Sequence, residues 1–292
     1  MSIDIEEYRN DWKSVLGLKQ IETDISNFGY SKEFIEKNSL LKKKSQRSDD
    51  HDGIVNFFEP IEVKQIDDSV FYREVKNYHY DKIPKVFKTQ FGKFKNHNNG
   101  EFPSWLGKEG YTGLPEKERE TDCLLGRDDF FIEGNFCDMF DCGQFTYAIS
   151  AMGDMLVANL KIVRIDKRLK ATVLYENSFI GDGTFLEYHG WFKNEFGCIV
   201  VASGYTIFDN EKSKKRITKY KTTLLQINYD GNLKVAKEWE FHIPNSNSIA
   251  RCGDYLYFGQ NKMVTRLNIN TGEFAYFTNK SDEELAALKD IW

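Results

Sequence analysis

The sequence predicts a mainly β protein: a propeller-like array of four-stranded antiparallel units with helical segments at its N-terminal and C-terminal ends. The first observation is a pattern that occurs three times, in which a short strand-like segment is followed by a turn and a second strand-like run. Its copies begin at Val163–Asp166, Leu225–Asn228 and Thr265–Asn268. The second observation is spacing, because Ile227 and Leu267 lie 40 residues apart, which is typical of propeller blades. The third is composition, since 23 Phe and 15 Tyr against 5 Pro favour a sheet-rich structure.

The length and charge of the chain limit its class. With 292 residues, 40% of them apolar, it is long enough to bury a substantial core in one large domain or two ordinary ones. A formal charge of −5 argues against a general nucleic-acid binder, which is usually basic. We find no signal-peptide pattern and no stretch of 18 apolar residues, so we expect a cytoplasmic protein that does not cross a membrane. Five cysteines without paired spacing fit that reducing compartment.

Residues 1–50 are predicted to form a helical N-terminal segment, and residues 51–292 the β-rich domain. The first helix is indicated by apolar residues at helical spacing with a glycine as the stop signal. These residues are Tyr8, Trp12, Val15, Leu16 and Gly17. A second helix begins at Ser31, whose hydroxyl can cap it, and it carries Phe34, Ile35 and Leu40–Leu41 on its apolar face.

A weaker copy of the hairpin follows the helical segment, and an irregular stretch follows that hairpin. Ile61, Val63 and Ile66 indicate a strand, Asp67–Asp68 a turn, and residues 70–78 the returning strand. Residues 81–130 then form an irregular aromatic and acidic insertion. Between residues 81 and 120, five glycines and three prolines are interleaved with six aromatic residues. Loops this long are usually functional or disordered, and the aromatic content indicates that this one packs against something.

From residue 128 onward each full unit reads strand, Gly-Asp turn, strand and hairpin, which makes four strands. Gly153–Asp154 and Gly253–Asp254 supply such turns, and Asp230–Gly231 supplies the turn of a hairpin. The first two copies are 62 residues apart, from Ile165 to Ile227, and a basic solvated hairpin inserted at residues 206–221 explains the excess. The chain ends in a helix capped at Ser281.

Short motifs settle neither the fold nor an activity. No Trp-Asp dipeptide and no kelch-type glycine pair occurs, so a large twisted antiparallel sheet of meanders stays open as an alternative to propeller blades. Phosphate-binding, nucleophile-elbow, zinc-protease and dinucleotide signatures are also missing. Cys137 and Cys142 lack two further ligands nearby in the sequence, so we expect no metal and no cofactor.

The strongest charge signal is an acidic run between Glu116 and Asp141. Nine acids stand there against three bases, which gives a local charge of −6. Such runs are commonly a solvated face. Beside an aromatic loop, the same run is also suited to steer and hold a cationic protein.

In general character, and in the stretch from Phe130–Phe136 to Gly259–Met263, the chain resembles the immunity proteins of bacterial polymorphic-toxin and contact-dependent growth inhibition systems. The resemblance implies a cytoplasmic inhibitor without an active site. It would bind a cognate toxin one-to-one, without membrane or direct nucleic-acid contact, and cover the cationic active site of a nuclease (RNase) domain. Carboxylates would replace phosphates and aromatic anchors would replace bases. The expected partner-binding residues are Asp128, Asp129, Glu133, Asp138, Asp141, Trp105, Tyr111, Tyr188 and Trp191.

Two other functions stay open. A propeller-type enzyme acting on a glycan or another small substrate would use Glu187, His189 and Asp182, with the histidine as general base. The same histidine also fits a satisfied imidazole beside aromatic residues. A generic binding scaffold is the remaining alternative.

Overall fold

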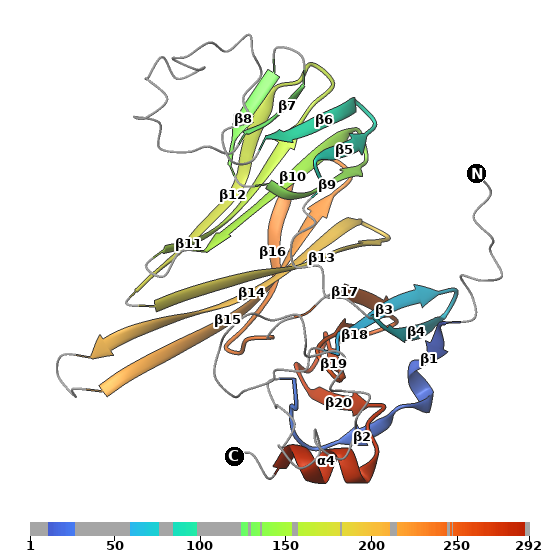
Figure 1. The fold of residues 1–292 in the computed structure, drawn as a ribbon. Helices are drawn as coiled ribbons and strands as arrows, with labels where there is room; N and C mark the ends of the chain where they lie inside the picture. The colour runs from blue at the N-terminus through green and yellow to red at the C-terminus, as the bar shows by residue number, and fades with distance from the viewer. Residues whose placement is uncertain are drawn as a thin grey trace. The chain divides into compact units, whose positions relative to one another are not determined.

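The structure is a computed structural model, and the fold that it shows is mainly β (Figure 1). It describes residues 11–26, 59–75, 84–97, 124–127, 130–134, 136–153, 157–181, 183–210, 215–243, 246 and 248–289. The strands in these residues form five antiparallel sheets. The chain divides into two compact units, a terminal unit (Met1–Tyr78 with Pro244–Trp292) and a central unit (His79–Ile243).

The central unit contains three four-stranded sheets in which the strand order follows the chain. The first sheet consists of β5 (Val86–Thr89), β6 (Gly92–His97), β7 (Leu124–Arg127) and β8 (Phe130–Glu133). The second sheet consists of β9 (Phe136–Cys142), β10 (Phe145–Gly153), β11 (Val157–Ile165) and β12 (Ala171–Ile180). The third sheet consists of β13 (Gly183–Asn194), β14 (Gly197–Asn210), β15 (Lys215–Asn228) and β16 (Leu233–Trp239). The prediction of four-stranded antiparallel units is therefore confirmed for this unit.

The middle sheet of the central unit, β9–β12, is buried on both faces. Along β10, Tyr147 and Ile149 pack with Leu225 of β15 in one core cluster. Ala148, which lies between them, packs with Phe94 of β6 in the other cluster. Side chains alternate between the two faces of a strand, so a strand buried on both faces reads as a continuous apolar run.

The terminal unit contains the other two sheets. One has the order β1-β4-β3 and consists of β1 (Lys13–Ser14), β4 (Ser69–Glu74) and β3 (Ile61–Ile66). The second has the order β17-β18-β19-β20-β2. It consists of β17 (Ser248–Cys252), β18 (Tyr255–Gly259), β19 (Val264–Asn268), β20 (Phe274–Thr278) and β2 (Lys19–Ile21). Ile61 and Val63 pack with Ala250 and Val264 in a shared core.

The predicted first helix is wrong over the described residues 11–21. Instead of an α-helix, this stretch forms β1, the 3-10 helix η1 (Val15–Gly17) and β2. The reason is tertiary: β1 pairs with the edge of β4 and β2 pairs with the edge of β20. Val15 and Leu18 are buried while Leu16 is 90% exposed, which departs from the expected helical face. The predicted second helix at residues 31–41 lies outside the described residues.

The prediction of an irregular stretch from residue 81 is wrong at residues 86–97, where β5 and β6 form a regular hairpin. Phe87 and Phe94 pair across it, and both are buried. Gly92 follows the turn with a φ of 108°, a conformation that favours glycine. The described residues 86–97 and 124–127 of this stretch therefore belong to a further four-stranded sheet.

Several local predictions are confirmed. Asp67–Asp68 lies between β3 and β4, and Gly231 takes a φ of 89° between β15 and β16. Helix α4 (Asp282–Lys289) begins with a capping box. The Ser281 N–H donates to Glu284 Oε2 at 2.8 Å, and the Glu284 N–H donates back to Ser281 Oγ at 3.2 Å.

In the described part of the chain, no helix has the length and apolar character that crossing a membrane requires.

Candidate functional site

Three of the predicted partner-binding residues meet inside the central unit. Asp138 lies on β9, and Tyr188 and Trp191 lie on β13, so their contact joins two sheets. The phenolic O–H of Tyr188 donates to Asp138 Oδ2 at 2.7 Å, and Trp191 hydrogen-bonds to the same carboxylate. Burial raises the pKa of Asp138, against these hydrogen bonds, which lower it. The carboxylate is therefore committed to hydrogen bonds within the fold.

Asp141 is also used within the fold. Its Oδ2 accepts from the Gln90 N–H at 2.8 Å, and its Oδ1 accepts from Thr146 Oγ1 at 2.6 Å. These contacts tie the turn of the β5–β6 hairpin to the second sheet. The remaining predicted residues are placed outside this cluster: Glu133 ends β8, with its side chain not among those described, and Trp105, Tyr111, Asp128 and Asp129 lie outside the described residues.

His189, the proposed general base of the enzyme hypothesis, lies close to two polar side chains within the fold. His189 Nε2 is 2.6 Å from Ser203 Oγ, and His189 Nδ1 is 3.9 Å from Glu187 Oε1. Ser203 Oγ donates to the Ile243 carbonyl at 3.1 Å and accepts from the Ile243 N–H at 3.3 Å. Ser203 Oγ thus lies within hydrogen-bonding distance of the imidazole and of both backbone groups of Ile243, and its single hydroxyl hydrogen can go either to His189 Nε2 or to the Ile243 carbonyl.

Burial agrees with a structural role for this histidine. The His189 side chain is fully buried, and this burial lowers its pKa to about 3, with a smaller contribution from His242. Through Ser203, which contacts both the imidazole and the backbone of Ile243, the segment that follows β16 is held against the third sheet. Of the three residues of the enzyme hypothesis, the structure brings Glu187 and His189 to 3.9 Å from each other, and Asp182 lies outside the described residues.

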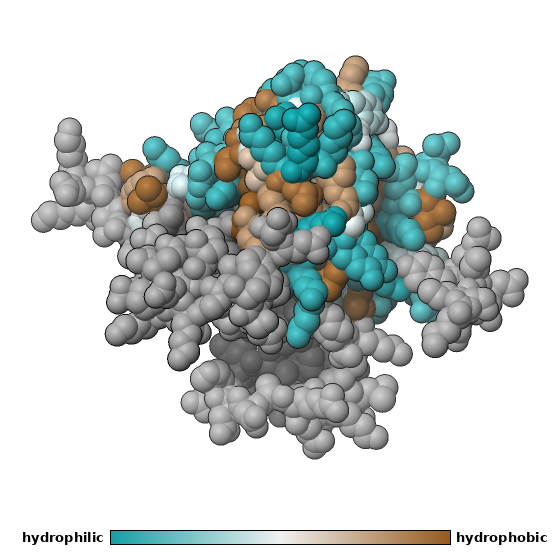
Figure 2. All heavy atoms as spheres, turned by 90° about the horizontal axis from the view of Figure 1, so that it is seen from above, coloured by the Kyte–Doolittle hydropathy of each residue, from teal (hydrophilic) through white to brown (hydrophobic). Residues whose placement is uncertain are grey.

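An open groove of about 880 Å³ lies between β12 and the strands β14–β16. Its lining includes the exposed apolar side chains of Ile180 and Phe208, which are 66% and 36% exposed. Figure 2 shows brown hydrophobic residues at the surface among teal hydrophilic ones. Exposed apolar patches with a polar rim mark interaction sites more often than scattered single residues do.

The groove continues the core face of the third sheet. On β14, Val200 and Ala202 pack in the core, and the same face continues outward through Thr206 and Phe208 to the groove. Its polar rim includes Lys221, which forms an ion pair of 2.5 Å with Glu238. At the groove, the second and third sheets therefore no longer pack directly against each other.

The opposite face of the hairpin stiffens the groove wall. Tyr205 stacks on Phe185 with ring centroids 5.6 Å apart and meets the edge of Tyr220 at 6.3 Å. On the groove side, Lys219 Nζ lies 5.3 Å from the centre of the Phe208 ring. Aromatic and cation–π contacts of this kind hold exposed rings in place.

The sequence predicts a solvated hairpin inserted at residues 206–221. In the structure, the paired strands of this stretch are the continuous extensions of β14 and β15, up to Asn210 opposite Lys215. The missed signal is apolar: Phe208, Ile217 and Tyr220 occur among the bases of this stretch. Phe208 and Ile217 are direct cross-strand partners, so they form one exposed apolar pair.

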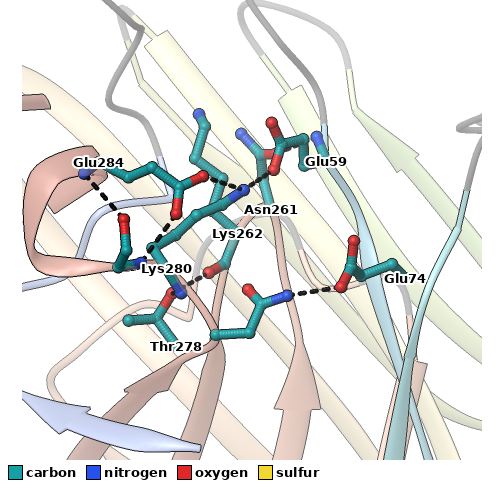
Figure 3. Close-up of polar contacts among 9 residues, drawn as sticks. Glu59, Glu74, Asn261, Lys262, Thr278, Lys280 and Glu284 are labelled. Carbon is teal, nitrogen blue, oxygen red and sulfur yellow. Dashed lines mark hydrogen bonds and ion pairs between the residues drawn. The ribbon is translucent and has the colours of Figure 1, made fainter. Parts of the chain in front are cut away.

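A second polar cluster lies in the terminal unit at the turn between β18 and β19 (Figure 3). Lys262 is 2% exposed with a φ of 63°, and burial lowers its pKa to about 8, partly offset by Glu59. Lys280 forms ion pairs with Glu59 and Glu284. The Lys262 carbonyl accepts from Thr278 Oγ1 at 2.6 Å. The cluster joins separate segments of this unit.

Among the described residues, no three His, Cys, Asp or Glu side chains come together in a way that could hold a metal ion. Comparison with protein-family models, curated proteins and solved structures gives no match for this chain. What the chain binds is therefore inferred from its own residues, and the groove of the central unit is the best candidate site.

Proposed function

We propose that this chain is a non-catalytic immunity protein that acts in the bacterial cytoplasm and neutralises a cognate toxin by binding it one-to-one. The observation that carries the proposal is the groove between β12 and β14–β16. It offers exposed apolar anchors with a charged rim, which is the composition of a protein-binding hot spot. The full burial of the His189 side chain supports a role without catalysis.

The groove suits a protein surface better than a small metabolite. Small-molecule sites enclose most of their ligand. Here the apolar lining side chains of Ile180 and Phe208 are themselves exposed, by 66% and 36%, so an occupant is covered on one side only. Projecting side chains of a partner protein fit that geometry.

The proposed toxin is a basic nuclease domain of the RNase class. Support comes from the acidic run between Glu116 and Asp141, which carries a charge of −6, and from Glu240 at the groove. Carboxylates compete for the cationic cleft that a nuclease presents to phosphate. Asp138 and Asp141 are hydrogen-bonded within the fold, so this role falls to the other acids.

We further propose that the four-stranded sheets are blades of a propeller-like scaffold. In support, β5–β8, β9–β12 and β13–β16 are consecutive meanders whose neighbouring sheets share core clusters within the central unit. In the terminal unit, β17–β20 form another meander in chain order. Repeated meanders of this kind are typical of blades.

The test is co-purification of the chain with the toxic domain encoded by the neighbouring upstream reading frame, together with protection of cells that express this domain. The wild-type chain is expected to elute with the toxin as one complex and to restore growth. Phe208→Ser and Ile180→Ser should weaken the complex at least about tenfold, since a few apolar anchors contribute most to affinity.

Phe196→Ser is the matched control, because Phe196 is 62% exposed in the turn between β13 and β14, outside the groove. It should leave binding unchanged. If Asp128→Asn with Asp129→Asn abolishes the complex while both groove variants retain it, the acidic run is the docking site and the groove is not. If no complex forms and cells are not protected, the immunity function itself is wrong.

A further inference from the structure

Residues 217–221 of β15 form a strand edge that no described strand covers. β14 and β15 pair along their whole length, from Asn210 opposite Lys215 to Gly197 opposite Asn228. β16 pairs with β15 only over residues 222–227. In an antiparallel ladder, alternate residues direct their N–H and C=O groups away from the partner strand. Within the described part of the chain, this edge therefore presents backbone groups to which another strand can bond.

The segment that follows β16 keeps this edge open. Thr222 Oγ1 donates to the Phe241 carbonyl at 2.7 Å, and Ser203 Oγ binds both backbone groups of Ile243. His242 meets the rings of Phe185 and Tyr205 at 5.7 and 5.5 Å. The chain therefore leaves the edge of β15 after β16 and lies on the face of the sheet.

The groove runs beside this open edge. Its lining includes Lys219, Tyr220 and Lys221 of the edge and Glu240, which follows the end of β16. The space along the edge is therefore open, and Ile180 and Phe208 supply apolar contacts next to it.

The side chains of the edge define the chemistry of an added strand. Residues 215–221 contain four bases and no acid. Ile217, Lys219 and Lys221 share one face, because side chains alternate along a strand. Opposite charges on neighbouring strands stabilise their pairing. Lys221 already forms an ion pair with Glu238, so a strand that pairs with this edge places a carboxylate opposite Lys219 and an apolar residue opposite Ile217.

The geometry points to β-strand addition at this edge: an extended acidic segment of the partner protein pairs with residues 217–221 of β15 and lays its apolar side chain into the groove. This inference deepens the proposed function and rests on it, since the segment belongs to the toxin. Main-chain hydrogen bonds supply affinity in this mode, and the groove with its lysines supplies specificity.

The outer edge of β16 is a poorer acceptor. Its pairing with β15 shifts register between Leu224 and Leu225, and such irregularities twist an edge away from further pairing. It also carries Glu238 beside its lysines, so its charge is mixed. The lysines of residues 215–221 repel the same edge of a second copy of the chain, which leaves that edge to an acidic strand.

The experiment measures binding of a synthetic peptide of about ten residues that carries Glu and Val two positions apart, on one strand face, by isothermal titration of the full chain. A second peptide carries N-methyl groups on alternate amides, which removes strand hydrogen bonds and keeps the charges. Lys219→Glu is the test variant, and Lys234→Glu on the exposed β16 is the matched control. We expect Lys219→Glu and N-methylation each to weaken binding at least about tenfold, and Lys234→Glu to leave it unchanged.

The inference is overturned if the peptide does not bind the wild-type chain, if the N-methylated peptide binds equally well, or if Lys219→Glu has no effect. Its failure is distinct from failure of the proposed function, which is judged by toxin co-purification. A toxin complex that is lost in Phe208→Ser and kept in Lys219→Glu would show that the groove binds the toxin without strand addition.

Discussion

Tyr188 and Asp138 join the second and third sheets of the central unit through one hydrogen bond of 2.7 Å, from the phenol of β13 to the carboxylate of β9. The bond lies at the margin of the main core cluster, where the ring of Trp191 stacks on Phe140 with centroids 4.4 Å apart. A hydrogen bond to a half-buried carboxylate is stronger than a neutral one, and removing its donor leaves the charge poorly satisfied.

Tyr188→Phe is expected to lower the free energy of unfolding by about 1–3 kcal/mol, because it removes this donor and keeps the ring. Urea denaturation of Tyr188→Phe, Asp138→Asn and the double variant measures the coupling. The double variant should cost less than the two single variants together. Tyr229→Phe, at an exposed tyrosine, is the control and should stay within about 0.5 kcal/mol of wild type. Strictly additive effects would show that the two sheets are not coupled here.

His189 should make the fold sensitive to acid. Its pKa is lowered from 6.5 to about 3 by burial, so between these values the unfolded chain binds a proton that the folded chain does not. Stability is then complete above about pH 6.5 and falls toward pH 3, by up to the order of 5 kcal/mol. The measurement is the unfolding free energy of wild type and His189→Gln from pH 7 to pH 4. The variant should show the shallower slope, and equal slopes would contradict the burial of a neutral imidazole.

Lys262 should make the stability of the fold depend on pH in the alkaline range. Burial lowers its pKa from 10.5 to about 8, so the unfolded chain binds the extra proton between these values. The cost of burying the charge, about 3 kcal/mol, is fully present below pH 8 and disappears as the pH rises toward 10.5. Lys262→Met keeps the length of the side chain and removes this cost. The stability difference between variant and wild type should shrink from pH 7.5 to pH 9.5, and a constant difference would contradict the lowered pKa.

The parts of the fold that the sequence predicts are those fixed by neighbours along the chain. The capping box of Ser281 and Glu284 and the glycine turn at Gly231 are local signals, and both are confirmed. β1 and β2 escape prediction because each is made by pairing with a distant strand edge, β4 and β20. Their helical spacing carries no information about those edges.

The candidate site also depends on residues that are distant in the sequence, so the sequence predicts little of it. Asp138 reads as a surface acid in its own segment, and its partner Tyr188 lies 50 residues further along the chain. The groove depends on β12 facing the far halves of β14 and β15, which no local pattern encodes. Its apolar side chains are visible in the sequence, but their exposure is decided only when the two sheets diverge.

The exposed pair of Phe208 and Ile217 gives the last prediction. Both side chains are more than a third exposed, so Phe208→Ser and Ile217→Ser should each change the free energy of unfolding by no more than about 0.5 kcal/mol. Leu225→Ala on the same hairpin should cost about 2–5 kcal/mol, because Leu225 is fully buried. Urea denaturation of the three variants checks this contrast. If Phe208→Ser costs as much as Leu225→Ala, Phe208 belongs to a closed core in solution. The groove would then be filled by the chain itself and could not receive a partner.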